Sequence, residues 1–307
     1  MRPAAANTPH MRHLGLIGAG AMGEPIGAAL LKAGFSLHTC AHVKRERVER
    51  LVAAGAVEHA DPAAVGQASD AVVLMLPDAP QVEEALFAAR GVLQGLRAGG
   101  YVIDMSTISP LAARAFHERL AAHGIRMLDA PVSGGPARAA AGDLAIMVGA
   151  QREAFVACEP VFRALGRPQH VGPPGMGETV KLVNQMIIAS VMQINAEALV
   201  FAKKAGADID QVRRVIAGAT GANYLLEKWL PNVWFDGARH AAGFALDLLR
   251  KDLNAALDTG RGLGVAMPLT ELAARRYAQA SAAGSGAKDY SAVAQLYEEA
   301  AGVKVAE

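Results

Sequence analysis

Apolar and polar positions alternate in short blocks along the first half of the chain. Short apolar runs of the kind that form buried strands recur there, and stretches with helical spacing separate them. We expect strands at 13–18, 35–41, 70–77, 100–106, 125–132 and 144–149, and helices at 24–33 and 44–54. Strands that alternate with helices across short connections predict βαβ units and a mostly parallel sheet.

The pattern changes at about residue 172, where the sequence VGPPGMG interrupts it. Beyond this point the spacing is helical, over 177–204, 208–217, 222–230, 245–260, 267–282 and 289–301. We therefore predict a flexible leader at 1–12, an α/β Rossmann domain at 13–174 and an all-α domain at 175–307. The helix at 177–204 would be ~42 Å long and would connect the two domains.

A glycine-rich loop follows the first predicted strand and leads directly into the first predicted helix. It reads Gly18-x-Gly20-x-x-Gly23, with Ala21 and Met22 before the last glycine. In this setting the glycines permit a tight turn, a close approach of the backbone to a pyrophosphate, and close packing of helix on strand. The N–H groups of the helix N-terminus attract phosphate oxygens. The loop predicts a dinucleotide site, and a glycine turn without a ligand is the alternative.

The second predicted strand ends without the acidic residue that usually holds the ribose 2′-hydroxyl of NAD. His42, Lys44 and Arg45 follow it instead. Cationic side chains at this place accept the 2′-phosphate of NADP, so we expect NADP(H) to be preferred and NAD(H) to be possible. The alternative is that Lys44 and Arg45 form only the solvated start of a helix.

Two further polar segments lie where predicted strands end. DAPVSGG places Ser133, Gly134 and Gly135 after the strand at 125–132, and MSTISP places Thr107 after the strand at 100–106. Ligands bind at the carboxyl ends of strands in open α/β sheets. Consecutive backbone N–H groups beside a hydroxyl suit a carboxylate. The alternatives are a plain turn for the glycines and a helix N-cap for Thr107.

The long predicted helix carries a lone ammonium group near its start. Lys181 and Asn184 are three positions apart and therefore share one helix face. A lysine with a pKa near ~10.4 is a poor base at neutral pH, but partial burial and a nearby cation such as Lys251 would lower that pKa. For a lysine considered alone, the ordinary interpretation is a stem lying over apolar surface with its head in water.

The composition fits a well-buried globular enzyme. Of the 307 residues, 52% are hydrophobic and 19% are charged, and the formal net charge is +1. This balance gives no indication of nucleic acid or an anionic membrane as a partner. No apolar run reaches the ~18 to 20 residues of a membrane span. Cys40 and Cys158 have no metal-ligand spacing, so we expect a cytoplasmic protein without a metal.

Four motifs together resemble the β-hydroxyacid dehydrogenase family, which includes 3-hydroxyisobutyrate dehydrogenases and tartronate semialdehyde reductases. They are GLIGAGAMG at 15–23, DAPVSGG at 129–135, GETVKLVNQ at 177–185 and KDLNAALD at 251–258. They have the family's order and spacing, and the resemblance extends from about His13 to Glu299. It implies a Rossmann domain, a long connecting helix, a helical domain, and assembly as a homodimer or homotetramer.

The resemblance also implies roles for individual residues. Lys181 matches the catalytic lysine, and Asn184 matches the asparagine that orients the substrate. The substrate carboxylate would lie on Ser133, Gly134 and Gly135. The positions that match cofactor contacts are Met22, Gly23, Leu76, Pro77, Thr107 and Lys251. Lys251 is next to Asp252, so a surface charge pair is the alternative for it.

Some residues depart from the family's pattern. Arg138 stands where glycine is common and adds a cation near the expected substrate carboxylate, and Asp143 stands where threonine is common. The Asn-Arg-Thr of NADP-preferring members is replaced by residues 41–43, Ala-His-Val. Asp247 is a candidate for substrate binding. This residue and the sequence of the motif KDLNAALD resemble tartronate semialdehyde reductases more closely than 3-hydroxyisobutyrate dehydrogenases.

We therefore predict an NAD(P)-dependent oxidoreductase that interconverts a small β-hydroxy acid and its semialdehyde, with Lys181 as general acid and base. Tartronate semialdehyde is the first substrate, and the expected partner is a small carboxylate rather than nucleic acid or a membrane. The alternatives are a 3-hydroxyisobutyrate dehydrogenase, an imine or other carbonyl reductase, and a dehydrogenase-like binding domain without activity. The presence of Lys181 weighs against the last two, because both typically lack this lysine.

Overall fold

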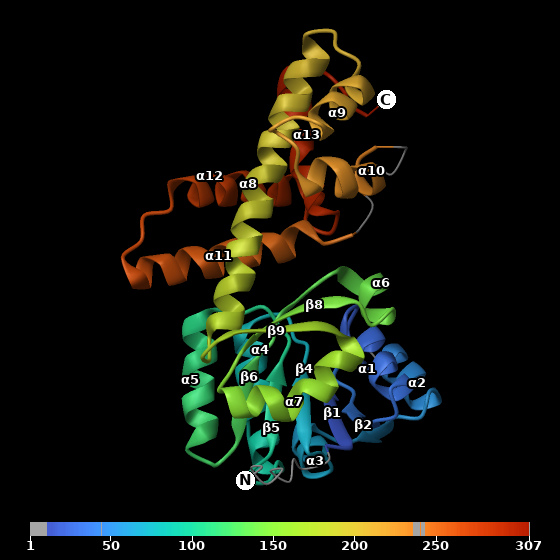
Figure 1. Cartoon of the computed structure of the whole chain (residues 1–307), viewed down its shortest axis with the longest axis vertical. Helices are drawn as coiled ribbons and strands as arrows, with labels where there is room; N and C mark the ends of the chain where they lie inside the picture. The colour runs from blue at the N-terminus through green and yellow to red at the C-terminus, as the bar shows by residue number, and fades with distance from the viewer. Residues whose placement is uncertain (1–10, 44, 236–239, 241–242, 307) are drawn as a thin grey trace, which may run out of the picture. The chain divides into compact units, whose positions relative to one another are not determined.

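The chain forms two compact units, one ending at Lys181 and the other beginning at Leu182. Figure 1 shows the computed structural model, in which residues 11–43, 45–235, 240 and 243–306 are described. Most of the predicted leader and the candidate residue Lys44 lie outside the described residues. Helix α8 (Met176–Lys204) begins in the first unit and ends in the second.

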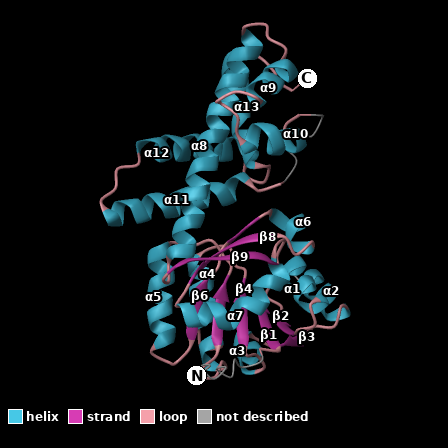
Figure 2. Cartoon of the chain, in the orientation of Figure 1, coloured by secondary structure: helices cyan, strands magenta, loops and turns pink. Residues whose placement is uncertain are grey.

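A mixed nine-stranded sheet forms the centre of the first unit, drawn in magenta in Figure 2. Its order is β3-β2-β1-β4-β5-β6-β8-β7, with β9 paired to β8. The strands from β3 to β6 are parallel, and β8 is antiparallel to β6 and β7. The chain leaves β1 for β2 and β3 on one side and returns to β4 on the other. This reversal is the switch point at which open α/β sheets bind ligands.

The bounds of the strands are β1 (His13–Ile17), β2 (Ser36–Cys40), β3 (Val57–His59), β4 (Ala71–Leu74), β5 (Tyr101–Asp104), β6 (Arg126–Asp129), β7 (Val132–Ser133), β8 (Leu144–Gly149) and β9 (Gly166–Gly172). The six predicted strands are all present. Five of them end earlier than predicted by one to three residues, such as β4, because the residues after each strand turn into the loops of the candidate site. β3, β7 and β9 were not predicted, since they are short or polar, and β9 contains Pro168.

Helices cover both faces of this sheet because its central strands are apolar on both sides. In β4, Ala71 and Val73 belong to a buried cluster with residues of α1 and α7, whereas Val72 and Leu74 belong to one with residues of α3, α4 and α5. The helices are α1 (Gly23–Lys32), α2 (Glu46–Ala53), α3 (Pro62–Gln67), α4 (Ala79–Phe87), α5 (Pro110–Ala121), α6 (Gly135–Ala140) and α7 (Arg152–Leu165). The predicted Rossmann fold is confirmed.

The second unit is helical, as predicted. After α8 it contains α9 (Ile209–Ala217), η2 (Leu225–Trp229), α10 (Leu230–Val233), α11 (Leu246–Leu263), α12 (Pro268–Ala280), η3 (Ser281–Ser285), η4 (Tyr290–Val293) and α13 (Ala294–Ala301). Among the described residues, one apolar cluster holds it together, and Tyr277, Leu230, Leu249 and Leu253 are fully buried members of it. The unit therefore has a hydrophobic core of its own.

Among the described helices, α8 has the length and composition of a membrane span, with a mean hydropathy of 1.4 over an 18-residue window. Polar residues interrupt this window, so it is not an unbroken apolar run. In the structure 44% of the window is buried, and the helix also buries the polar side chains of Gln185, Gln193 and Asn195. These contacts identify α8 as a core helix of the protein.

Asp289 ties separate segments of the helical unit together. Its buried carboxylate accepts hydrogen bonds from the Trp229 indole N–H at 3.2 Å and from the backbone N–H groups of Phe244 and Ser291 at 2.9 Å. A buried carboxylate is tolerated when several donors satisfy it in this way. The turn before η4 is therefore fixed against η2 and the segment that precedes α11.

Near this turn, His240 predicts a loss of stability at acid pH. Burial, followed by the charges of Lys288 and Lys304, lowers the pKa of His240 from 6.5 to about 4, and its Nδ1 lies 2.8 Å from the Ser291 hydroxyl. Between these two pH values the unfolded chain binds a proton that the folded chain does not. The free energy of unfolding should therefore fall as the pH drops below 6.5, by up to about 3 kcal/mol at pH 4.

The measurement is urea unfolding of the wild-type protein and of His240→Gln at a series of pH values. Carboxylates titrate alike in both proteins, so the difference between the two curves isolates His240. A difference that stays constant between pH 7 and pH 4 would contradict the prediction.

Candidate functional site

The segments predicted to bind ligands in the first unit follow four neighbouring strands. β1, β4, β5 and β6 are parallel, so their carboxyl ends lie along one edge of the sheet. The glycine loop follows β1, Leu76 and Pro77 follow β4, Thr107 follows β5, and Ser133 closes the short strand β7 after β6. Residues that are far apart in the sequence are therefore gathered at the edge where such sheets bind ligands.

The glycine loop has the backbone geometry of a phosphate cradle. Gly18 has a φ of +100°, and a Cβ atom at Gly18 or Gly23 would lie closer than 3.0 Å to a backbone carbonyl oxygen. A Cβ atom at Gly20 would meet nothing within 4 Å, so the loop is open on that side. Met22, the N-cap of α1, makes no side-chain hydrogen bond to the helix start. No side chain of the cap therefore competes with a phosphate for the first N–H groups.

The predicted contacts to the ribose lie just beyond β2. His42 is exposed there, whereas Lys44 is outside the described residues. Arg45 pairs with Glu58 of β3, at 2.9 Å between Nη2 and Oε1. Two of the predicted contacts to the ribose phosphate, His42 and Arg45, are described in the structure. Arg45 is paired with a carboxylate, whereas no ion pair of the described residues includes the exposed His42.

A second arginine, which the sequence pattern did not single out, lies closer to the glycine loop. Arg47 donates to Glu24 at 2.8 Å, and its Nη1 lies 3.5 Å from the carbonyl oxygen of Gly20. Glu24 also accepts from Arg50 at 2.9 Å, and this hydrogen bond in particular holds the pKa of Glu24 below its usual value. Only the folded chain brings α2 against the start of α1, so sequence spacing gave no signal for Arg47.

The loops after β4 and β5 are joined by a hydrogen bond. The backbone N–H of Leu76 donates to the Ser106 hydroxyl at 2.9 Å, which fixes the two loops against each other. Pro77 is exposed and Thr107 is half-buried. The N-cap of α5 is Ser109, whose hydroxyl accepts the N–H two residues further on. Thr107 is therefore not the cap of that helix.

Ser133, Gly134 and Gly135 form the turn that begins α6. Gly134 has a φ of +141° and Gly135 a φ of +73°, in the left-handed region that favours glycine. Gly134 is the N-cap of α6, and it has no side chain to bind the first N–H groups of that helix. The first N–H groups of α6 therefore have no capping side chain, and they follow Ser133 directly in the chain.

Two residues that depart from the family's pattern are partners in the structure. Arg138 pairs with Asp143, with its Nη2 3.0 Å from Oδ2, and Arg167 of β9 lies 3.2 Å from the other oxygen. The stem of Arg138 packs against the Ser133–Gly135 turn, since a Cβ atom at Gly134 would lie 3.0 Å from the Arg138 Cβ atom. Arg138 is thus beside the turn as predicted, but its guanidinium group forms an ion pair with Asp143.

The start of α8 is held by Asp129, a carboxylate for which the sequence predicted no role. Its Oδ1 accepts the N–H of Gly175 at 2.7 Å, and its Oδ2 accepts the N–H of Glu178 at 3.0 Å. Burial raises the pKa of Asp129 to about 7, although the two N–H groups act in the opposite direction. One feature of the sequence could have indicated that a distant residue caps this helix. No Ser, Thr, Asp or Asn lies just before α8, so the helix start has no local side-chain cap.

Lys181 lies in the second turn of α8, one turn beyond Glu178. It is 7% exposed, so its side chain is largely removed from water. Asn184 follows three residues later on the same helix face and is half-buried. Lys181 is the more buried of these two predicted site residues.

Asn184 belongs to a chain of polar contacts in the helical unit. Its amide nitrogen donates to Gln185 at 2.9 Å, and Gln185 donates to Asp252 of α11 at 2.7 Å. Asp252 in turn lies 2.9 Å from the ammonium nitrogen of Lys251. Lys251, whose side chain is 19% exposed, is therefore part of a mostly buried network rather than a solvated charge.

Asp247 lies in the first turn of α11, one turn before Lys251. Its carboxylate accepts hydrogen bonds from the Ser281 hydroxyl at 2.6 Å and from Arg250 at 3.0 Å. The bond from Ser281 is the main reason that the pKa of Asp247 is below its usual value. These contacts hold α11 against the segment after α12, and a role in substrate binding stays a prediction.

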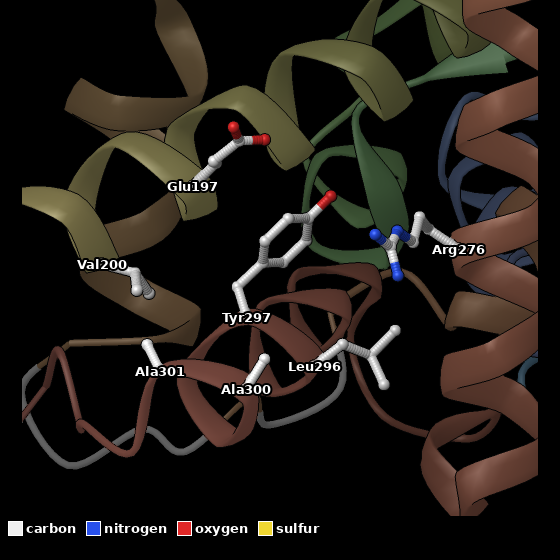
Figure 3. A pocket seen from close by; sticks show the side chains of 7 residues that line it. All are labelled: Glu197, Val200, Arg276, Leu296, Tyr297, Ala300 and Ala301. Carbon is white, nitrogen blue, oxygen red and sulfur yellow. The ribbon is translucent and has the colours of Figure 1, made fainter.

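A separate groove in the helical unit contains none of the predicted site residues. Figure 3 shows Glu197 of α8, Arg276 of α12 and Tyr297 of α13 around it, with alanine, valine and leucine side chains between them. The Tyr297 hydroxyl donates to Gln193 at 3.1 Å. In the part of the chain that the structure describes, no group of three or more His, Cys, Asp or Glu side chains is arranged to hold a metal ion.

Comparison with known proteins identifies two family matches that together span residues 13–297. Residues 13–183 match the family described as the NAD binding domain of 6-phosphogluconate dehydrogenase. Residues 175–297 match the family described as NAD-binding of NADP-dependent 3-hydroxyisobutyrate dehydrogenase. The boundary between the matches falls in the first turns of α8.

Individual relatives are similar over nearly their whole length. The chain is 38% identical over 301 residues to 2-hydroxy-3-oxopropionate reductase of Escherichia coli (strain K12), covering 95% of this chain and 99% of that protein. It is 37% identical over 293 residues to 2-(hydroxymethyl)glutarate dehydrogenase of Eubacterium barkeri, covering 95% and 97%. A structure of Mycobacterium tuberculosis 3-hydroxyisobutyrate dehydrogenase with L-serine has a TM-score of 0.86 at 32% identity, covering 94% and 99%. The chain therefore belongs to the β-hydroxyacid dehydrogenase family and is an NAD(P)-dependent oxidoreductase of small hydroxy acids.

Proposed function

We propose that this enzyme reduces tartronate semialdehyde (2-hydroxy-3-oxopropionate) to glycerate, with Lys181 as the general acid. The observation that carries the proposal is the burial of Lys181, which is 7% exposed in the second turn of α8. The start of this helix is bonded to Asp129, at the end of the strand that leads to the Ser133–Gly135 turn. The relative that reduces 2-hydroxy-3-oxopropionate, at 38% identity, supports the choice of substrate.

The residues of this chain bind the substrate and move its proton. The hydroxyl of Ser133 and the backbone N–H groups of Gly134 and Gly135 hold the substrate carboxylate. The ammonium group of Lys181 donates a proton to the aldehyde oxygen as it becomes an alcohol, and in the oxidative direction the neutral amine takes the proton back. When bound, the nicotinamide supplies the hydride to the carbonyl carbon. Asn184 orients the substrate, and its bond to Gln185 fixes its amide group.

Replacement of Lys181 tests the substrate and the mechanism together. Lys181→Ala should lower kcat for the reduction of tartronate semialdehyde by roughly 10²- to 10⁴-fold, since it removes the proton donor. The dissociation constant of the cofactor, measured by fluorescence titration, should change little. Lys204→Ala is a matched control, because it removes an exposed lysine from the other end of α8.

If the wild-type enzyme does not turn over tartronate semialdehyde with either cofactor, the substrate assignment is wrong. 3-Hydroxyisobutyrate is then the second candidate, favoured by the match of residues 175–297 to the 3-hydroxyisobutyrate dehydrogenase family. Its oxidation in the same assay would identify it. If Lys181→Ala retains turnover, the role of Lys181 is wrong whichever substrate is used.

We further propose that the enzyme binds its cofactor through the glycine loop and prefers NADP(H) to NAD(H). Gly18, Gly20 and Gly23, with Ala21 and Met22, form the cradle for the phosphates. Leu76, Pro77, Thr107 and Lys251 are the other proposed contacts. The 2′-phosphate would lie at the end of β2, where His42 is exposed and none of residues 41–45 is acidic. The description of the second family match, which names an NADP-dependent enzyme, supports this preference.

His42→Asp tests the cofactor preference. An aspartate at this place repels a 2′-phosphate and accepts a hydrogen bond from a 2′-hydroxyl. The ratio of kcat/KM for NADPH to that for NADH should exceed one in the wild-type enzyme and fall on the order of tenfold in the variant. His123→Asp, which introduces the same charge at an exposed histidine after α5, should leave the ratio unchanged. A wild-type ratio below one would overturn the preference.

We also propose that the chain assembles as a homodimer or homotetramer through the helical unit. Val183, Ile187, Ile194 and Phe201 of α8 are between 48% and 75% exposed. Their spacing of four and seven residues places them on one side of the helix. Leu269 of α12 is also 73% exposed. Exposed apolar stripes of this kind mark surfaces that another protein covers.

A charge in this stripe should disrupt the assembly. The molar mass of the wild-type protein, measured by sedimentation equilibrium, should be a multiple of 31.8 kDa, and Ile187→Glu with Ile194→Glu should shift it towards the monomer. Val215→Glu places a charge at another exposed apolar residue, on α9, and should not. A monomeric wild-type protein would contradict the proposal.

A further inference from the structure

Asp129 occupies the junction between the sheet edge and helix α8. It is the last residue of β6 and is 2% exposed. Each oxygen of its carboxylate accepts a backbone N–H from the start of α8, from Gly175 at 2.7 Å and from Glu178 at 3.0 Å. A carboxylate at a helix N-terminus both satisfies free N–H groups and opposes the positive end of the helix dipole. Here the capping residue comes from a strand 46 and 49 residues earlier in the chain.

The packing around this carboxylate is close. Asp129 pairs with Gly149 of β8, where an added Cβ atom would lie 2.6 Å from both carboxylate oxygens. At Gly177, in the first turn of α8, an added Cβ atom would lie 2.9 Å from Oδ2 and 2.5 Å from the carbonyl oxygen of Asp129. Two positions on two different elements are thus glycine where any side chain would collide with Asp129. A close-packed junction of this kind restricts the position of the helix start.

The junction is connected to Lys181 through a single turn of helix. Glu178, whose N–H is bonded to Asp129, lies three residues before Lys181 on the same helix face. Along the chain, Asp129 is followed by Ala130, Pro131 and Val132 and then by Ser133. The side chain therefore joins the segment proposed to bind the substrate carboxylate to the helix proposed to protonate the carbonyl.

We propose that Asp129 is a positioning residue that sets the place of Lys181 relative to the Ser133–Gly135 turn. The carboxylate does not touch the substrate; it fixes the first turn of α8 against the end of β6. This inference rests on the proposed role of Lys181. It gives a common reason for Asp129, Gly149 and Gly177, none of which is assigned a contact with substrate or cofactor.

The first test is Asp129→Asn. The variant keeps one acceptor oxygen but turns an amide N–H₂ group towards a backbone N–H donor, so the helix start must shift. Because displacement of a catalytic group by about 1 Å costs up to about 10²-fold in rate, kcat should fall roughly 10- to 100-fold. KM for NADPH should stay within about twofold, since the glycine loop after β1 makes no contact with Asp129 among the hydrogen bonds of the structure.

A matched control is Asp61→Asn. Asp61 caps α3 in the same unit, where its Oδ1 accepts the N–H of Ala64 at 2.8 Å, and no predicted site residue lies on that helix. It should lose stability as a capping variant does and keep kcat. An equal loss of kcat in both variants would mean that Asp129 acts only through general stability.

The second test combines Asp129→Asn with Lys181→Ala. If Asp129 acts through Lys181, the double variant should have the kcat of Lys181→Ala, because no proton donor is left to misplace. Losses that multiply would show that Asp129 acts independently and would overturn the inference. If Lys181→Ala loses turnover but Asp129→Asn keeps the wild-type kcat, the inference fails while the proposed function stands.

Hydrogen exchange of the wild-type protein gives a test that needs no variant. The amides of Gly175 and Glu178 should exchange as slowly as amides in the middle of α8, because both are bonded to a buried carboxylate. Exchange at the rate of a frayed helix end would overturn the inference, even if Asp129→Asn cannot be purified in folded form.

Discussion

The first unit depends on the burial of both faces of its parallel strands. Strands β1, β4 and β5 have apolar side chains on both sides, and two separate layers of helices cover them. Polar and flexible residues are therefore confined to the ends of the strands. Since the parallel strands run in one direction, all the loops at their carboxyl ends lie along one edge. The glycine loop, the loops after β4 and β5 and the Ser133–Gly135 turn share that edge for this reason.

The polar groups at this edge bond to one another, in most cases over long sequence separations. Ser106 accepts the N–H of Leu76, and Asp129 accepts two N–H groups of α8. Asp143 lies between Arg138 and Arg167, so two unusual residues beside the proposed carboxylate turn form one ion-paired group. Exposed pairs contribute little to stability. Their effect is to hold side chains in place around loops that have no regular hydrogen-bond ladder.

Local pattern predicted most of the fold because strands and helices differ in the period of their apolar residues. The six apolar strands and the helical second half follow from that period alone. β9 did not, since it is polar, contains Pro168 and pairs only with β8. The glycine loop was predictable because its function needs glycine at fixed spacing. The partners of Asp129 and Arg45 were not, because they lie 13 to 49 residues away and no local spacing encodes such contacts.

The distance along the chain between Asp129 and its partners has a consequence for synthesis on the ribosome. At ~5–20 residues per second, the 46 to 49 residues between them take about 2 to 10 seconds to be added. During that interval the end of β6 has no helix to cover its carboxylate, and water must solvate it. The N-terminal unit cannot close until residues 175–178 emerge, only a few positions before the unit ends at Lys181. The last segment of this unit to be translated is thus the one that completes it.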